Sequence, residues 1–232
     1  TAGIGQVYLE LIEPRTQRPQ MAMSFMTAAA LLALEEARAA GLALDDAVYE
    51  RGMQALRRCQ LPNGAYTYTV NTIPSPSRLD SINQVKGSLG RIPACDLALR
   101  LGGDPIDDER IRRGLTHFFT EHRFLDIALH RPYPHEAYYA NSGYFYLFGH
   151  YYAARAITVL PPADRVACWP RLCAEVTKLQ GRDGAMWDYG MHAYHKPYGT
   201  AYGVLTLAAA LQDAPAPAAP PAAPPPDATP QR

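Results

Sequence analysis

The sequence has neither an excess of charge of one sign nor a long apolar run. Its 232 residues include 22 Lys and Arg and 22 Asp and Glu, which gives a formal net charge of zero. A surface that follows nucleic-acid phosphates is rich in Lys and Arg, so we expect no nucleic-acid partner. The longest helical apolar run, residues 28–34, ends at Glu35 and Glu36. A run of this length is too short to cross a membrane, and we expect no spanning helix.

Cysteine is scarce, and the short motifs of nucleophilic and nucleotide sites are missing. No two cysteines have C-x-x-C or zinc-ribbon spacing, and no Ser-His-Asp set, P-loop or G-x-G-x-x-G is visible. The four cysteines are Cys59, Cys95, Cys168 and Cys173. We interpret them as small buried hydrophobic residues, with one disulfide among them as the alternative. Because no cofactor motif is visible, we predict no cofactor.

The sequence does contain a unit that occurs three times. A charged amphipathic helix ends in a loop with Gln or Gly, and the loop leads into a helix of small and apolar residues; residues 60–66 and 180–187 are the clearest loops. Because repeated helix pairs stack into an array, we predict an all-α fold of about three and a half helical hairpins, with an inner and an outer layer of helices. The expected pairs are 24–41 with 45–59, 87–103 with 107–118 and 141–157 with 161–180, followed by an unpaired helix over 198–212.

Local signals refine these boundaries. Ser24 is predicted to cap the first helix, and Asp45 or Asp46 the second. We expect Val48, Met53 and Leu56 to form the apolar face of the second helix. Residues 66–70 are β-like by propensity, and we expect an extended stretch there without a sheet. Pro170 interrupts the last outer helix early, so we expect this helix to begin either near residues 161–164 or only after Trp169.

Composition divides the chain into three parts. Residues 1–20 form a poorly defined N-terminal segment punctuated by proline, and residues 21–213 form the helical domain. Residues 214–232 are rich in Pro and Ala. Such a tail has few side chains to bury, and we expect it to be disordered or polyproline-like.

The loops carry a resemblance to a known superfamily. Gln60-x3-Gly64-x-Tyr66 resembles the QW motif of terpene cyclases, and residues 180–187 resemble its Gln-x-x-Asp-Gly-x-Trp form with one additional residue. Residues 198–205, Tyr-Gly-Thr-Ala-Tyr-Gly-Val-Leu, are similar to the inner-helix opening of the same superfamily. The resemblance to the terpene cyclase and protein prenyltransferase superfamily covers residues 21–213. It implies an α/α toroid, of which this chain supplies a fragment or an open arc.

The acids of that superfamily are missing. We find no D-x-D-D motif and no Asp-rich magnesium motif. Protein prenyltransferases hold zinc with Asp, a Cys two residues later and a distant His; here Cys95 and Asp96 are adjacent and point about 100° apart on a helix, so they are poor joint ligands. We predict no metal site. The candidate catalytic residues are Asp96, His150, which lies in an apolar helix, and His195, which can stand for the distant His.

Aromatic residues at the inner helices are the candidate ligand-binding groups. They suit an apolar, isoprenoid-like ligand, although packing between helices also explains them. The same rim carries the loop histidines of segments 130–135 and 192–195, which can form an acid–base site. The candidate residues are Tyr138, Tyr139, Tyr144, Trp187, Tyr194, Tyr198 and Tyr202.

Four hypotheses of function follow. The first is a toroid domain that binds an apolar small molecule or a protein partner and lacks the cyclase acid. The second is part of an active cyclase or prenyltransferase that missing repeats complete. The third is a structural module for protein interaction. A carbohydrate-active toroid is the fourth, and it requires paired carboxylates from Glu136 and Asp183 or Asp188.

Overall fold

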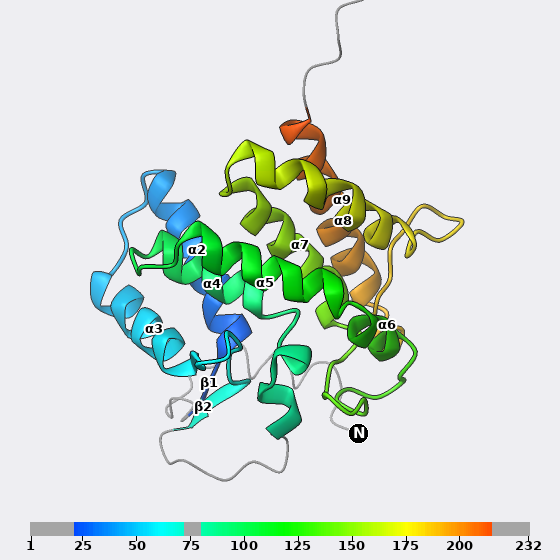
Figure 1. Cartoon of the computed structure of the whole chain (residues 1–232), viewed down its shortest axis with the longest axis horizontal. Helices are drawn as coiled ribbons and strands as arrows, with labels where there is room; N and C mark the ends of the chain where they lie inside the picture. Colours follow the sequence, from blue (N-terminus) through cyan, green and yellow to red (C-terminus); the bar gives the residue numbers. More distant parts are fainter. Residues whose placement is uncertain (1–20, 72–79, 215–232) are drawn as a thin grey trace, which may run out of the picture.

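The computed structural model describes residues 21–71 and 80–214, and this part of the chain is all-α apart from one small sheet (Figure 1). The all-α prediction is confirmed. The N-terminal segment 1–20 and nearly all of the Pro/Ala-rich tail lie outside the described residues. The elements are β1 Met21–Met23, α2 Ser24–Ala39, α3 Asp46–Cys59, β2 Thr69–Asn71, η1 Asp80–Asn83, η2 Val85–Gly87, α4 Ile92–Leu101, α5 Asp108–Thr120, α6 Arg123–Leu129, α7 Phe145–Thr158, α8 Pro162–Thr177 and α9 His195–Asp213.

The helices pack in the order that repeated hairpins require. Helices α2, α4, α7 and α9 pack against one another in succession and form an inner layer. Helix α3 packs on α2, α5 on α4, and α8 on both α7 and α9, which makes an outer layer. Figure 1 shows the four inner helices running in the same direction, as successive copies of one unit would. Closure of this array into a toroid remains a prediction.

Burial follows the two layers. Every residue from Ile92 to Leu99 of α4 is buried, whereas the outer helix α3 buries one face only. That face is Tyr49, Met53 and Leu56, whose spacing of four and three residues places them on one side of a helix. The sequence pattern also placed Val48 there, which is wrong: Val48 is 48% exposed, because it lies one residue away from the stripe.

The two Gln-containing loops have the same backbone structure. Gln60 bridges to Tyr66, and Gln180 bridges to Met186 in the same antiparallel manner. Gly64 and Gly184 have φ of +89° and +81°, a conformation that glycine adopts without strain. The two loops are of equal length, so the structural counterpart of Tyr66 is Met186, and Trp187 lies one residue beyond it.

Each of these loops is held by one hydroxyl near the start of the next inner helix: Ser88 precedes α4, and Thr200 lies within α9. Ser88 Oγ accepts from the Tyr66 N–H at 3.1 Å, and Thr200 Oγ1 accepts from the Met186 N–H at 2.9 Å. Both hydroxyls also donate to the carbonyl of the same loop residue, at 3.2 Å in each case. The repeat is thus reproduced down to individual hydrogen bonds.

Two local predictions are wrong. Residues 21–23 pair with residues 69–71 in an antiparallel two-stranded sheet, so the extended stretch does form a sheet. Ser24 begins α2 but does not cap it, because its hydroxyl donates to the Thr67 carbonyl at 2.7 Å. Helix α8 runs through Pro170. Proline has no N–H to donate to the Val166 carbonyl four residues earlier, and Val166 is 72% exposed. The predicted Asp45 cap is confirmed: its carboxylate accepts from two N–H groups of the first turn of α3.

Within residues 21–71 and 80–214, no helix is both long enough and apolar enough to cross a bilayer.

Candidate functional site

Aromatic side chains of the inner layer form one connected group, here called the inner aromatic cluster. It links α2 to α9 through ring contacts: Phe25 lies 5.7 Å from Phe148, Phe148 lies 6.1 Å from Tyr202, and Tyr202 lies 4.6 Å from Tyr198. These separations are typical of favourable aromatic pairs. The structure thus brings Tyr144, Tyr198 and Tyr202 of the predicted residues together, and the members of the cluster are Phe25, Tyr68, Tyr144, Phe145, Phe148, Tyr151, Tyr152, Tyr198 and Tyr202.

A buried acid and a buried histidine adjoin this cluster. His195, the first residue of α9, lies 5.6 Å from the Tyr198 ring and 6.5 Å from the Tyr144 ring. Its Nδ1 is 4.0 Å from Oδ1 of Asp188. Both of these atoms are buried, and neither has a hydrogen-bond partner. Two complementary polar atoms that face each other without a bond are uncommon in a protein interior and indicate a functional site.

The backbone holds Asp188 in place. Its Oδ2 accepts from the Leu147 N–H, in the first turn of α7, at 2.9 Å. A carboxylate is favoured there by the positive end of the helix dipole. Gly143 allows the close approach, because a Cβ at this position would lie 2.5 Å from the Asp188 carbonyl oxygen.

Burial disfavours the charged form of both side chains and shifts their pKa values in opposite directions. It raises the pKa of Asp188 from 3.8 to about 7, although the hydrogen bond from the Leu147 N–H acts in the opposite direction. Burial, followed by the nearby His192, lowers the pKa of His195. An acid whose pKa lies near the working pH, beside a histidine whose neutral form is favoured, is suited to proton transfer.

A hydrogen-bonded chain adjoins the same site. His135 Nδ1 donates to the Ala140 carbonyl at 2.6 Å, so its Nε2 accepts from the Tyr144 hydroxyl at 3.0 Å. The Tyr68 hydroxyl lies 3.2 Å from that of Tyr144. His135 and Ala140 have φ of 64° and 53°, in the left-handed region that side chains disfavour. The predicted loop histidine His135 is therefore held in a strained loop beside the cluster.

The other predicted aromatic residues lie apart or at the surface. Tyr138 is 82% exposed and pairs with Tyr139, which in turn packs on Phe124 of α6. Trp187 is 40% exposed and donates to the Tyr189 carbonyl at 2.7 Å. Tyr194 is 64% exposed and covers His195 with a ring separation of 4.5 Å.

Asp96 is part of a buried structural network. Its Oδ1 accepts from the Tyr66 hydroxyl at 2.7 Å and from Arg110 Nε at 3.0 Å. Burial raises the pKa of Asp96 to about 6, although the Arg110 charge opposes the rise. Two other arginines near Asp96 in the sequence pair elsewhere. Arg91 donates to backbone carbonyls of the adjoining loops, and Arg100 pairs with an acid at the start of α5.

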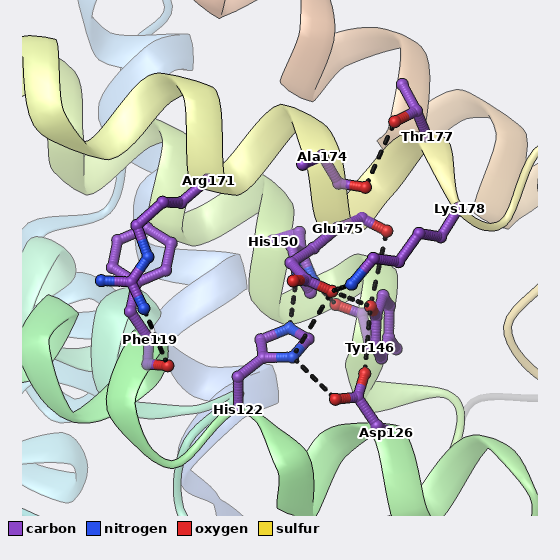
Figure 2. Close-up of polar contacts among 10 residues, drawn as sticks. All are labelled: Phe119, His122, Asp126, Tyr146, His150, Arg171, Ala174, Glu175, Thr177 and Lys178. Carbon is purple, nitrogen blue, oxygen red and sulfur yellow. Dashed lines mark hydrogen bonds and ion pairs between the residues drawn. The ribbon is translucent and has the colours of Figure 1, made fainter.

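His150 leads to a group that sequence reasoning missed (Figure 2). It is fully buried in α7; its Nδ1 donates to the Tyr146 carbonyl at 2.7 Å, and its Nε2 lies 3.0 Å from Nε2 of His122. Beyond His122 lie two carboxylates, Asp126 and Glu175. The spacing of His122 and Asp126, one helical turn apart, was the available signal, but nothing in the sequence brings α8 to them.

The other two predicted loop carboxylates, Asp183 and Glu136, and two cavities lie apart from the inner aromatic cluster. Asp183 is exposed and paired with Lys196, and Glu136 is exposed as well. A cavity of about 240 Å³ lies between α5 and α8. Another, of about 410 Å³, is lined by residues 129–133 and 190–191. Neither of these two cavities includes the inner aromatic cluster, which is an open surface at its α9 end, where Tyr198 is 38% exposed.

Comparison with known proteins adds no relative to this description. No family model matches the chain, and neither a curated protein nor a solved structure matches it.

Proposed function

We propose that this chain is a toroid-like domain that binds an apolar, isoprenoid-like ligand against the inner aromatic cluster. The observation that carries the proposal is the continuity of the cluster across the inner layer, from Phe25 of α2 to Tyr198 of α9. Aromatic faces offer apolar contact together with attraction for a cation, which suits an unsaturated hydrocarbon chain.

Exposed apolar side chains extend this surface along α9. Tyr198, Tyr202 and Leu205 follow one another at helical spacing, and Leu205 is 49% exposed. Contiguous exposed apolar groups on a protein surface are typical of sites that bind ligands or partners.

The pair of His195 and Asp188 supplies the polar end of such a site. Their unpaired atoms can bond a single polar group of a ligand, such as the hydroxyl of an isoprenoid alcohol, at the edge of the cluster. This arrangement, apolar surface with a few convergent polar atoms, is the usual composition of a small-molecule site.

Isoprenoid binding is tested by titrating the whole chain with farnesol, an isoprenoid alcohol, in isothermal titration calorimetry. Truncation of Tyr198 or Tyr202 to Ala should weaken binding about tenfold, which corresponds to about 1.4 kcal/mol of lost apolar contact. Tyr133→Ala is the matched control, because Tyr133 is 59% exposed and outside the cluster. Equal affinities in all four proteins, or no binding to the wild type, would refute the proposal.

Acid–base catalysis is the second candidate, and the pKa of Asp188 near 7 favours it. In this case the chain supplies part of a cyclase-like or prenyltransferase-like active site, with His195 and Asp188 moving the proton. The test is incubation with squalene and with prenyl diphosphates, followed by mass spectrometry of the products. A product that persists in His195→Gln and Asp188→Asn would rule out this pair as its source.

A further inference from the structure

The His122 cluster, which consists of His122, Asp126 and Glu175, is separate from the inner aromatic cluster and independent of the function proposed above (Figure 2). His122 precedes α6, Asp126 lies within α6, and Glu175 comes from α8. His122 Nδ1 is 3.2 Å from Asp126 Oδ2 and 3.7 Å from Glu175 Oε2. One potential ligand atom from each residue lies within 4.8 Å of the other two.

His150 determines which nitrogen of His122 faces the carboxylates. His150 Nδ1 carries a proton, because it donates to the Tyr146 carbonyl at 2.7 Å. A fully buried ring favours the neutral form, which carries a single proton, so Nε2 of His150 has none and accepts. His122 Nε2, 3.0 Å away, must then donate. In neutral His122 the lone pair is consequently on Nδ1, directed at two carboxylates.

A nitrogen lone pair and two carboxylates repel one another at these distances, which favours a positive charge among them. The Lys178 ammonium on Glu175 and a proton on Nδ1 each offset this repulsion in part. A metal ion would offset it more fully, because it would contact all three groups. We propose that His122, Asp126 and Glu175 bind one divalent transition-metal ion, of which zinc suits one imidazole and two carboxylates best.

The geometry is close to that of a tetrahedral ion. Ligands about 2.0–2.1 Å from such an ion lie about 3.3 Å apart, and the two distances from His122 Nδ1 are 3.2 and 3.7 Å. The side chains of Asp126 and Glu175 are 45% and 23% exposed and can rotate to complete the site. Three protein ligands leave a fourth position for water on the exposed side.

The surrounding residues support this assignment. A metal-binding histidine usually donates its other ring N–H to a fixed acceptor, and His150 is that acceptor for His122. The Tyr146 hydroxyl lies 3.3 Å from Glu175 Oε2 and 3.4 Å from Asp126 Oδ1, and can orient both carboxylates.

Lys178 competes with the metal. Its ammonium is 2.5 Å from Glu175 Oε2, the oxygen that would bind the ion, and its side chain is 60% exposed and free to move away. Lysine therefore lowers the affinity of the site without closing it. Removal of this charge should tighten metal binding, a result that a purely structural ion-pair network would not give.

The experiment is a titration of the chelator-treated full chain with Co²⁺ and Zn²⁺, followed by visible absorption and calorimetry. We expect one equivalent with the spectrum of tetrahedral cobalt bound through nitrogen and oxygen. Glu175→Gln, which preserves shape, and His122→Ala should each weaken binding at least about tenfold, whereas Lys178→Ala should strengthen it by a similar factor. His130→Ala, which removes an exposed loop histidine, is the matched control.

Each other outcome overturns the proposal. Unchanged affinity in Glu175→Gln, a thiolate-to-cobalt absorption band, or no tightening in Lys178→Ala would place the ion elsewhere. Absence of binding in the wild type and in Lys178→Ala alike would leave the cluster as an ion-pair network. Because Glu175→Gln and Lys178→Ala change side chains near the surface, circular dichroism should confirm that both fold even where His122→Ala does not.

Discussion

Asp188→Asn should stabilise this protein, and the gain should depend on pH. The carboxyl group is 3% exposed, and one of its oxygens has no hydrogen-bond partner. Burial raises its pKa from 3.8 to about 7 in the folded state. Between these values the folded chain keeps a proton that the unfolded chain has lost, so stability decreases as the pH rises through this window.

The size of the effect follows from the pKa difference. A shift from 3.8 to about 7 corresponds to about 4 kcal/mol of unfavourable free energy once the group is fully ionised. Asparagine keeps the shape and the oxygen that accepts from the Leu147 N–H, but it cannot ionise. The variant should therefore match the wild type at about pH 4 and exceed its stability by up to about 4 kcal/mol at about pH 8.

The assay is urea unfolding of both proteins across this pH range, followed by far-UV circular dichroism. Titrating groups far from Asp188 cancel in the difference, whereas His195, 4.0 Å away, contributes to it. Asp183→Asn is the control, because Asp183 is an exposed neighbour in the same loop and should show no such rise. If the difference in unfolding free energy between the variant and the wild type does not change with pH, or decreases as the pH rises, then Asp188 is not a buried, destabilised acid beside His195.

Three further predictions concern the core. Because the pKa of His150 is lowered from 6.5 to about 3, the wild type should lose up to about 5 kcal/mol as the pH falls through that window; His150→Asn should reduce this loss in urea unfolding. Tyr66→Phe removes a donor to buried Asp96 and should lower the unfolding free energy by about 1–3 kcal/mol. Equal stability of the variant and the wild type in urea unfolding would contradict this. Leu97→Ala in α4 should cost about 2–5 kcal/mol, whereas Val204→Ala on the exposed face of α9 should change stability by less than about 0.5 kcal/mol; thermal unfolding of the two variants compares them.

Much of the fold follows from local signals in the sequence. The alternation of apolar and amphipathic helices, the Asp45 cap and the glycines at positions 64 and 184 all act over a few residues, and each is present in the structure. The pairing of residues 21–23 with 69–71 was missed because it depends on two distant segments. Val48 was misplaced because one residue of helical phase separates a buried from an exposed position.

The candidate sites were harder to predict than the fold, because they also depend on contacts between distant segments. His195 was identified, but its relation to Asp188 depends on the Leu147 N–H, which only the packing of the loop on α7 supplies. The sequence indicated aromatic residues at the inner helices without showing that Tyr138 lies outside the cluster. The His122 cluster joins the start of α6 to α8, and no local pattern connects these two segments.

The central claim, that the inner aromatic cluster is a ligand site, is tested most directly by aromatic NMR of the tyrosine-labelled full chain during titration with farnesol. We predict shifts for Tyr144, Tyr198 and Tyr202, with Tyr133 and Tyr138 unchanged. Shifts confined to Tyr133 and Tyr138, or no shifts at saturating farnesol, would contradict it.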